Sequence, residues 1–352
     1  MEQAPVKAIH VPIVARPDHD GLPGTSSLEA MLSAIDAYDV DRLSTGDVQG
    51  YSLEQYLGLG YFAALARRPA VGAFVTTAAT RDPGLHAASL ASLDAVTGGR
   101  AFMVLGRGDG VVKNLGLRPH TIRETREALL AIRALLTDRE ARIGDRHVRL
   151  PWPDAPGPRV PLYLVAGGPK MMRVAGEVAD GAYVATGVTP DNIARAHAWL
   201  DAGADAAGRA RPDVWWVTRF AIGDTYEEAV ATIAESLTSM GNHSLRGADF
   251  AERGVPPELW EPLAEYHRRY DWARKNPLPG SGYDNVDLMN ELGLTEYFLE
   301  RFAIVGTPDQ VVERMRTLAA RGVDQITCLV DSPRELELLG ELIPRAKAPV
   351  GA

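Results

Sequence analysis

The sequence predicts a single (β/α)8 barrel, and three observations lead to that fold class. Short apolar or β-branched runs bounded by turn residues recur eight times along the 352 residues, and segments of helical spacing separate them. Parallel strands need crossover helices, and right-handed crossovers close eight such units in chain order. The composition, 46% apolar and 24% charged, excludes a fibrous, disordered or disulfide-rich chain. A doubly wound sheet is the alternative.

Each predicted strand is a short run of apolar or β-branched residues with turn residues at its ends. The eight runs are residues 6–14, 40–43, 70–76, 101–105, 161–165, 181–185, 214–222 and 324–330.

The predicted helices lie between these runs. In residues 121–136, Leu129, Ile132 and Leu136 fall on one helical face. Four segments begin with a hydroxyl residue that is followed three positions later by an acid or amide, as in a capping box. These residues are Ser26, Thr121, Thr225 and Thr307. Pro190 and Pro308 stand at first helical positions, where the missing N–H costs nothing.

Two segments interrupt the alternation within one domain, which we predict to span residues 1–352. Residues 143–158 are polar and rich in Pro and Arg. Residues 241–300 are rich in aromatics and too long for a plain loop, so we expect an insertion before the last repeat. An insertion on a barrel is usually a lid over the site or an oligomer contact, and both remain open.

Charge and hydropathy exclude several classes of partner. The chain has 37 basic and 46 acidic residues, a net charge of −9, and no Lys or Arg run, so we expect no nucleic-acid partner. No apolar stretch approaches the ~18 residues of a membrane helix, and the N-terminus lacks a leader. We therefore expect a cytoplasmic protein with no membrane partner. Cys328 lies in an apolar run and is predicted to be a buried thiol.

Metal-binding and nucleophile motifs are absent from the sequence. None of the eight His is paired with another His at i,i+4, and neither G-x-S-x-G nor a P-loop occurs, so we expect no metal site. His10 is the one histidine within a predicted strand, where it either lines the barrel mouth or belongs to the core. Few strong acids or bases remain, which favours an organic cofactor.

The C-terminal ends of the strands carry the candidate site, because that face of a barrel collects the chemistry. Gly167 and Gly168 separate a strand from a helix beginning near Pro169, so bare amides point outward at a positive helix end. Lys170 adds charge there, and Thr186 follows the neighbouring strand. Together these predict a phosphate site, and the alternative is a plain tight turn with a solvated Lys.

A glycine-rich segment, residues 106–110, follows the fourth strand. It lacks the G-x-G-x-x-G spacing that opens a helix, and residues 111–119 read as a loop, so a dinucleotide fingerprint is disfavoured. In a barrel, these glycines would let a flat ring approach the backbone, with Asp109 or Arg107 hydrogen-bonding its edge. The alternative is an exposed turn.

Several motifs together resemble the luciferase-like monooxygenase superfamily, over most of the chain from about residue 70 onward. They are Thr-x-x-x-Arg-x-Pro at 77–83, Ser-Leu-Asp-Ala-Val-Thr-Gly-Gly-Arg at 92–100, Gly-x-Gly-Asp at 106–109, Gly-Gly-Pro-Lys at 167–170, Ala-Gly-Glu-Val-Ala-Asp-Gly at 175–181 and Val-Gly-Thr-Pro-Asp at 305–309. Gly-Gly-Pro-Lys and Gly-x-Gly-Asp are most similar to the branch that uses the deazaflavin coenzyme F420, which includes methylenetetrahydromethanopterin reductase.

The resemblance implies that Phe74 and Val75 are joined by a non-proline cis peptide bond that backs the deazaflavin ring, with Thr76 and Thr77 beside it. It also implies that other strand ends hold the rest of the coenzyme. The implied positions are Arg107, Gly108 and Asp109 for the pyrimidine edge, and Ala166, Gly167, Gly168, Lys170, Ala185 and Thr186 for the phosphate.

The chain departs from this family at the end of the second strand. Members tend to have Asp-His there, with the imidazole near the reactive ring carbon, whereas this chain reads Leu43-Ser-Thr-Gly-Asp47. We predict that Asp47 takes the place of that His, contacts the coenzyme and is the catalytic acid or base, with a raised pKa. His10 is the second catalytic candidate. The alternative for Asp47 is a residue that merely caps its loop.

The resemblance therefore implies an F420-dependent oxidoreductase that transfers a hydride between the coenzyme and a small organic substrate. The reaction would reduce C=O, C=N or C=C, or oxidise an alcohol. The alternatives are an FMN-dependent luciferase-like monooxygenase and a non-catalytic flavin-binding protein. The expected partners are the small-molecule substrate and further copies of the chain, in a homodimer or higher homo-oligomer.

Overall fold

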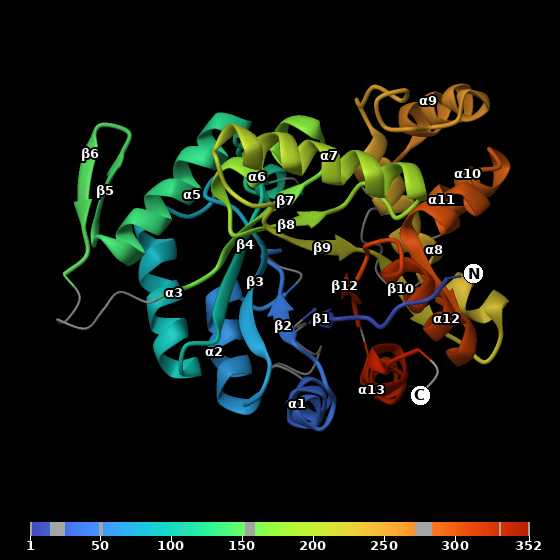
Figure 1. Cartoon of the computed structure of the whole chain (residues 1–352), viewed down its shortest axis with the longest axis horizontal. Helices are drawn as coiled ribbons and strands as arrows, with labels where there is room; N and C mark the ends of the chain where they lie inside the picture. Colours follow the sequence, from blue (N-terminus) through green and yellow to red (C-terminus); the bar gives the residue numbers. More distant parts are fainter. Residues whose placement is uncertain are drawn as a thin grey trace.

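Eight parallel strands close into a barrel in the computed structural model (Figure 1). The structure describes residues 2–14, 25–48, 52–108, 110–151, 159–271, 284–330 and 332–350. Around the barrel the order is β1-β12-β9-β8-β7-β4-β3-β2, which is chain order for the eight barrel strands. These strands are β1 (Ala8–Pro12), β2 (Arg42–Thr45), β3 (Ala70–Thr76), β4 (Ala101–Leu105), β7 (Leu162–Ala166), β8 (Gly181–Val184), β9 (Asp213–Val217) and β12 (Gln325–Thr327). The predicted (β/α)8 barrel is confirmed.

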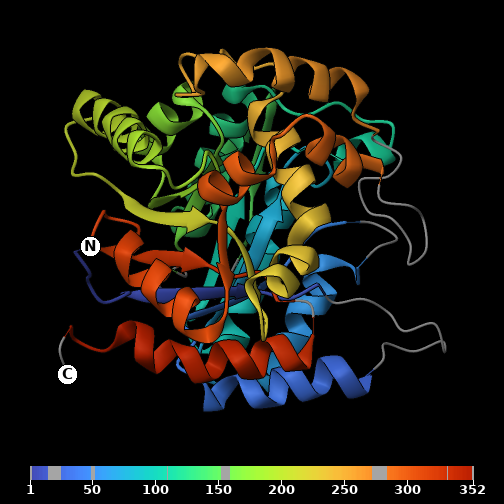
Figure 2. The same ribbon diagram turned by 90° about the vertical axis from the view of Figure 1, so that its right-hand side faces the viewer.

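Helices connect successive strands. The predicted starts at Thr121, Thr225 and Thr307 are confirmed, whereas Ser26 lies inside a helix that already begins at Thr25. Capping boxes occur at Thr121 and Thr225, and the Thr307 backbone N–H donates to Gln310 Oε1 at 2.9 Å. Figure 2 shows α1 and α13 alongside each other, where they pack across the barrel seam. The helices are α1 (Thr25–Ala34), α2 (Gln55–Leu65), α3 (Pro83–Thr97), α4 (Gly110–Asn114), α5 (Ile122–Thr137), α6 (Pro169–Val178), α7 (Pro190–Ala206), α8 (Tyr226–Leu245), α9 (Trp260–Arg269), α10 (Asp284–Glu291), α11 (Thr295–Phe302), α12 (Pro308–Ala319) and α13 (Pro333–Lys347).

Three local predictions need correction. Residues 214–222 form two strands, because the chain leaves the barrel after β9 and continues as β10 (Arg219–Ile222), which pairs with β11 (Ala303–Gly306). Residues 110–114, predicted as loop, form the single-turn helix α4. The polar segment after α5 contains the hairpin β5 (Glu140–Ile143) and β6 (Arg146–Arg149), which projects at the left of Figure 1.

The insertion has a core of its own. The β10–β11 ladder brackets α8 to α11, and the predicted start at Gly241 falls inside α8, which ends at Leu245. Leu237, Tyr266 and Phe298 are buried in a cluster separate from the main core. Most of the aromatic side chains that mark this segment in the sequence therefore pack against one another.

The barrel interior holds aromatic rings around one arginine. Phe102, Tyr163, Tyr183 and Trp215 are buried. The Arg42 guanidinium carbon lies 4.2 Å from the Trp215 ring centroid, and its Nη1 donates to the Tyr183 hydroxyl at 3.1 Å. Arg42 is the first residue of β2, so this cluster closes the barrel at the end opposite the strand C-termini.

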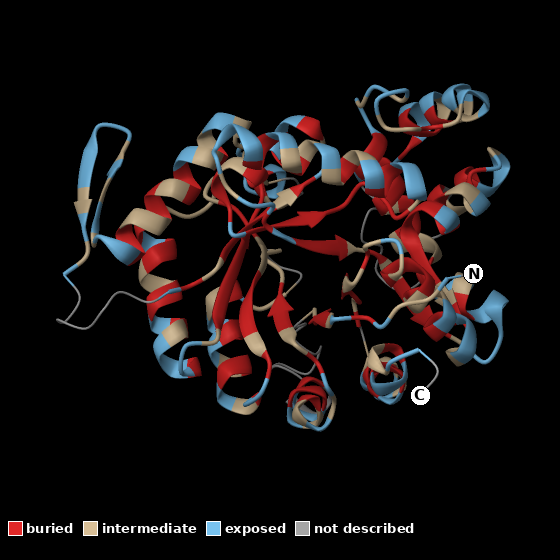
Figure 3. Cartoon of the chain, in the orientation of Figure 1, coloured by how far each residue is buried: buried red, intermediate tan, exposed pale blue. Residues whose placement is uncertain are grey.

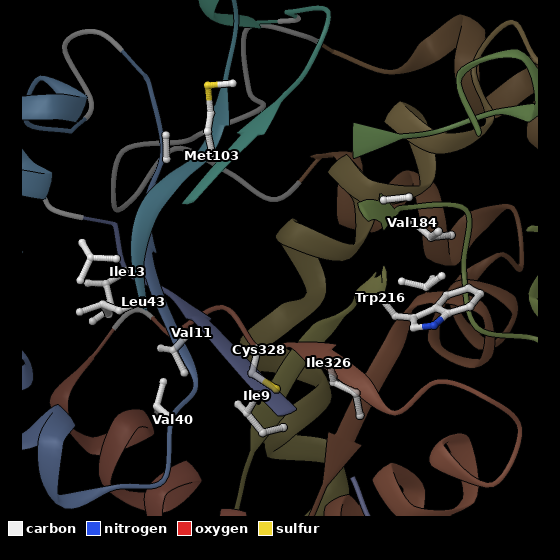
Figure 4. Packing of buried hydrophobic residues seen from close by; sticks show 14 of the residues in the cluster. Ile9, Val11, Ile13, Val40, Leu43, Met103, Val184, Trp216, Ile326 and Cys328 are labelled. Atoms are coloured by element: carbon white, nitrogen blue, oxygen red, sulfur yellow. The ribbon is translucent and has the colours of Figure 1, made fainter. Parts of the chain in front are cut away.

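The main core lies between the barrel and its helices, as the buried inner faces of the helices show (Figure 3). Residues of alternate orientation on the strands contribute to it, since successive strand side chains point to opposite faces. Cys328 lies among the labelled core residues of Figure 4, and burial raises the pKa of its thiol, as expected of a packing residue. Within the described residues, no helix is long and apolar enough to cross a membrane.

Helices α6 and α7 approach closely at two glycines, which gives a test of the packing. A Cβ on Gly203 would lie 1.9 Å from the Arg173 carbonyl oxygen, whereas a Cβ on Gly60 of α2 would meet nothing within 4 Å. Gly203→Ala is expected to lower the free energy of unfolding by about 2–3 kcal/mol through overpacking. Gly60→Ala, the control, should raise it by up to about 1 kcal/mol. Urea denaturation measures both, and equal effects would contradict the close approach.

Candidate active site

A cavity of about 380 Å³ opens at the C-terminal ends of β2 and β3. Its wall combines acidic, basic, hydroxyl and apolar side chains, so it suits a small polar molecule with an apolar part. The lining residues are Asp47, Val48, Ser52, Leu53, Glu54, Thr80, Arg81 and Leu115. It lies on the face of the barrel where chemistry is expected.

Asp47 is a half-buried acid in this wall. The Thr76 hydroxyl donates to Asp47 Oδ2 at 3.4 Å, which joins the ends of β2 and β3. Burial raises the pKa of the Asp47 carboxyl, and Glu54 raises it further, while Arg81 and the Thr76 hydroxyl lower it. The net direction is upward, so the carboxyl holds its proton to a higher pH than a free Asp. This agrees with the expectation from the sequence.

Arg81 and Glu54 form an ion pair beside Asp47. Glu54 also accepts the Leu57 backbone N–H at 2.9 Å and so caps α2. The Arg81 guanidinium carbon lies 4.9 Å from the Tyr56 ring centroid. Arg81 belongs to the Thr-x-x-x-Arg-x-Pro motif, but no pattern in the sequence places it beside Asp47, because its partners Glu54 and Tyr56 belong to the start of α2.

His86 is a buried, neutral histidine that contacts Tyr56, the ring next to Arg81. His86 Nε2 is 3.3 Å from the Thr77 carbonyl oxygen, and Nδ1 is 2.9 Å from the Tyr56 hydroxyl. A carbonyl only accepts, so Nε2 carries the hydrogen and Nδ1 accepts from Tyr56. Burial lowers the pKa of His86 to about 4, which keeps the ring neutral near pH 7. Through these two hydrogen bonds His86 and Tyr56 hold the backbone at Thr77, near the residues that line the cavity.

The ends of β3 and β4 meet as the resemblance implies. The Phe74–Val75 peptide bond is cis, and both side chains are partly exposed in an otherwise buried strand. The Gly106 N–H donates to the Thr76 carbonyl at 2.8 Å. A Cβ on Gly108 would lie 3.3 Å from Thr77 Oγ1, and its φ of +89° favours glycine. Thr76, Thr77 and Gly106 are buried, so the surface that these two strand ends expose comes from Phe74, Val75 and Gly108.

Arg107 does not lie free at this mouth. Its Nε donates to the His120 carbonyl oxygen at 2.7 Å, and the side chain is exposed. The predicted contact with the coenzyme edge would require that side chain to turn. Asp109, predicted beside it, lies outside the described residues.

His10 lies inside the barrel and has no exposed surface. Its ring packs edge-on against Phe74, with centroids 4.9 Å apart, and Nε2 is 2.7 Å from Ser44 Oγ. Burial and the charge of Arg42 hold the pKa of His10 well below its ordinary value. The core interpretation of this residue therefore fits better than a place on the mouth, and direct contact between His10 and a substrate is disfavoured.

The ends of β7 and β8 lie side by side and form what we call the anion site: Gly167, Gly168, Ala185 and Thr186. The Ala185 N–H donates to the Ala166 carbonyl at 3.4 Å. Gly168 is the N-cap of α6, with Pro169 at the first helical position and Lys170 exposed after it. Thr186 is 2% exposed, and its Oγ1 has no hydrogen-bond partner among the described residues. A buried hydroxyl beside helix amides suits an anionic group.

Two arginines of the insertion reach the anion site, and the sequence analysis did not single them out. Arg253 donates to the Gly167 carbonyl, and Arg301 donates through Nε to the Thr186 carbonyl at 3.0 Å. These contacts could not be predicted from the sequence, because the partners are far apart in the chain and no local pattern marks either arginine. Within the described ranges, no group of His, Cys, Asp and Glu could hold a metal ion.

The barrel and this mouth define the class of protein: an enzyme built on a (β/α)8 barrel, with an anion site beside an acid-lined cavity. Within that class, the chain belongs to the luciferase-like monooxygenase family, whose model matches residues 11–325. The predicted family is confirmed.

Relatives and solved structures refine the comparison. The chain is 26% identical over 307 residues to a 5,10-methylenetetrahydromethanopterin reductase of Archaeoglobus fulgidus, covering 83% of this chain and 87% of the relative. The structure of the F420-dependent tetrahydromethanopterin reductase from Methanopyrus kandleri superposes with a TM-score of 0.71 at 23% identity, covering 98% and 100% of the two chains. A monooxygenase from Streptomyces bottropensis gives 0.66 at 17% identity, covering 97% and 100%.

Proposed function

We propose that this chain is a coenzyme F420-dependent oxidoreductase that transfers a hydride between the deazaflavin and a small organic substrate. One observation carries the proposal: an anion site with a buried, unpartnered Thr186 hydroxyl opens at the same barrel mouth as the Asp47 cavity. A phosphate-bearing organic cofactor fits that pair of sites. The names of the relatives support deazaflavin as the cofactor.

The residues present fit this coenzyme. The Gly167 and Gly168 amides, the Thr186 hydroxyl and Lys170 would hold its phosphate. Phe74 and Val75, which are partly exposed, would lie against its ring. Gly108 allows close packing of its backbone against Val112, because a Cβ there would lie 2.6 Å from Val112 Cγ1. When bound, the deazaflavin supplies a ring carbon that exchanges hydride and reacts poorly with oxygen.

Asp47 would handle the proton in this reaction. Its half-buried carboxyl lines the cavity beside the cis peptide strand, held by Thr76. A carboxyl with a raised pKa either takes a proton from an alcohol or gives one to a nascent alkoxide or amine. Leu53 and Leu115 supply apolar contact, and Ser52 and Thr80 supply hydroxyls, which suits a small molecule with a polar and an apolar part. The proposed hydride transfer makes that molecule a carbonyl, an imine, an alkene or an alcohol.

Binding titrations test the cofactor. Purified protein is expected to bind coenzyme F420 more tightly than FMN, and Lys170→Ala should weaken F420 binding about 10–150-fold, the equivalent of about 1.5–3 kcal/mol. Lys7→Ala is the matched control, because Lys7 precedes β1 at the opposite end of the barrel and pairs with Asp324. Tighter binding of FMN than of F420 would contradict the proposal.

An FMN-dependent monooxygenase is the second candidate, favoured by the shared fold of the Streptomyces enzyme. A non-catalytic flavin-binding protein is the third. The spectrum of the ligand retained after purification, and its bleaching or reoxidation by candidate substrates, separates the three. Hydride exchange without oxygen consumption supports the first.

We also propose that the chain forms a homodimer or higher homo-oligomer. Leu57 of α2 and Leu85 of α3 are 70% and 58% exposed on helices that pack against each other, which makes this face the candidate for a contact between copies. The molar mass in solution distinguishes this arrangement from a monomer.

A further inference from the structure

The anion site is crowded by arginines that lack carboxylate partners. Arg253, from the segment between α8 and α9, and Arg301 of α11 contact the backbone of the site. Arg195 of α7 lies behind them, where a Cβ on Gly254 would be 3.2 Å from its Nε. Among the described residues, none of the three forms an ion pair with Asp or Glu. Glu252, which precedes Arg253 in the chain and raises its pKa, is exposed. Arg301 is buried, and Arg253 and Arg195 are half-buried. Positive charges that lose contact with water are ordinarily paired in proteins, so this cluster suits an anion.

Arg301 organises the cluster from a fully buried position. Its guanidinium donates to the Thr186 carbonyl at 3.0 Å, to Asn192 Oδ1 at 3.0 Å and to the Arg253 carbonyl at 2.9 Å. All these acceptors are neutral. Arg301 therefore ties the segment after β8 to the insertion, and it fixes the backbone on either side of the anion site.

Arg253 lies directly on the glycine turn. Its Nη1 donates to the Gly167 carbonyl, and a Cβ on Gly168 would lie 2.6 Å from its Nη2, so only a glycine admits the guanidinium at this distance. Burial lowers the pKa of Arg253, and the charge of Arg301 lowers it further. A second observation is independent of these charges: the buried Thr186 Oγ1 lies one strand away, without a partner.

We propose that Arg253 of the insertion is the principal cation of the anion site and binds the coenzyme's phosphate together with the Gly167 and Gly168 amides and the Thr186 hydroxyl. The identity of the anion rests on the proposed function, whereas the role of Arg253 does not. The insertion then completes the cofactor site, in place of serving only as a lid over the substrate or as an oligomer contact.

Binding measurements on the purified full-length protein, free of coenzyme, test this role. The probes are inorganic phosphate, coenzyme F420, and the deazaflavin with its ribityl chain but no phosphate. Arg253→Ala is expected to weaken binding of phosphate and of F420 about 10–100-fold, and to change binding of the phosphate-free deazaflavin less than about twofold. Arg253→Lys should retain part of the affinity. Arg269→Ala, which removes an exposed arginine of the same insertion, should match wild type.

Gly168→Ala provides a second variant that keeps the Arg253 side chain. The backbone φ of Gly168 is −175°, which any residue adopts, and the clash is with the end of a flexible side chain. The variant should therefore fold normally, displace the guanidinium and weaken phosphate binding as Arg253→Ala does.

The outcomes separate the two proposals. If Arg253→Ala binds phosphate and F420 as wild type does, or weakens all three probes equally, Arg253 is a structural residue and the inference is wrong, while the proposed function stands. If wild type binds phosphate in an Arg253-dependent manner but does not bind F420, the inference stands and the proposed function is wrong. If phosphate has no measurable effect on wild type, the inference is also wrong.

Discussion

Asp47→Asn is expected to slow hydride transfer about 10²–10⁴-fold in a single turnover, with little change in coenzyme binding. The substitution keeps the shape of the side chain and removes its titration. Asp47 lines the cavity and accepts a hydrogen bond from Thr76, the residue that follows the cis Phe74–Val75 peptide, so it lies beside the peptide that would lie against the ring. Rapid mixing of reduced coenzyme with substrate measures the step directly.

The pH dependence follows from the direction of the Asp47 pKa. Burial raises that pKa, so the change between carboxylic acid and carboxylate occurs at a higher pH than for a free Asp. If Asp47 is the base, the rate falls as the pH drops through this raised pKa; if it is the acid, the rate falls as the pH rises through it. In either case Asp47→Asn removes that limb of the profile.

Stability provides a control for this variant. A pKa that is raised in the folded state contributes stability below the unfolded pKa, and that contribution is lost as the pH rises through the folded pKa. At neutral pH, Asp47→Asn should therefore not destabilise the fold. Asp205→Asn, at an exposed position of α7, should leave rate and stability unchanged. Asp47→His should be tolerated sterically and should restore part of the rate. If hydride transfer in Asp47→Asn equals that of wild type, Asp47 is a loop residue.

Arg301→Ala is expected to lower the free energy of unfolding by about 3–5 kcal/mol, the range for losing a buried, hydrogen-bonded large side chain. The variant loses donors to Thr186, Asn192 and Arg253, and it leaves a void at the centre of the contact between the insertion and β8. A Cβ on Gly187 would lie 2.5 Å from Arg301 Cγ, which shows how closely the side chain fills this space. Urea denaturation measures the loss.

Arg123→Ala on α5 is the matched control for Arg301→Ala. The Arg123 side chain is 82% exposed, and its Nε is 3.9 Å from Glu127, so its removal should change the free energy of unfolding by less than about 0.5 kcal/mol. Similar losses for both variants would mean that the bonds of Arg301 add nothing to stability. A variant that fails to accumulate as folded protein is replaced by Arg301→Lys, which should retain part of the network and lose less.

The barrel was predictable from the sequence because its signals are local. A strand of the barrel is a short apolar run, and a helix start needs only a hydroxyl and an acid or amide three residues apart, as at Thr121 and Thr225. The one strand prediction that failed is residues 214–222, a mostly apolar run that includes Thr218 and Arg219. Within it the pairing partners change from β12 and β8 to β11. The spacing of apolar residues along the chain does not indicate which strands will pair with each other.

The glycine turns of the anion site could also be predicted from the sequence. Glycines and hydroxyl residues that directly follow the strands of a parallel barrel always lie at the same end of that barrel. The strand ends that carry Gly167, Gly168 and Thr186 lie side by side, and Asp47 lines the cavity, while the cofactor contacts of these residues stay predictions. The sequence does not decide whether His10 lines the barrel mouth or belongs to the core. A position on a strand gives the direction of a side chain but not its depth in the barrel. Its burial among Phe74, Phe102, Tyr183 and Trp215 is a property of the closed barrel.

The sequence by itself determined the barrel, its helix starts, the family and the glycine turns of the anion site. Only the tertiary structure brought the charges to that site. Arg301 and its acceptor Thr186 are 115 residues apart, and Arg253 and Gly167 are 86 apart. Arg81, Tyr56 and His86 likewise meet only when α2 and α3 pack beside β3. A side chain's pKa and partners depend on desolvation and on distances across the fold, and neither is encoded in the spacing of residues along the chain.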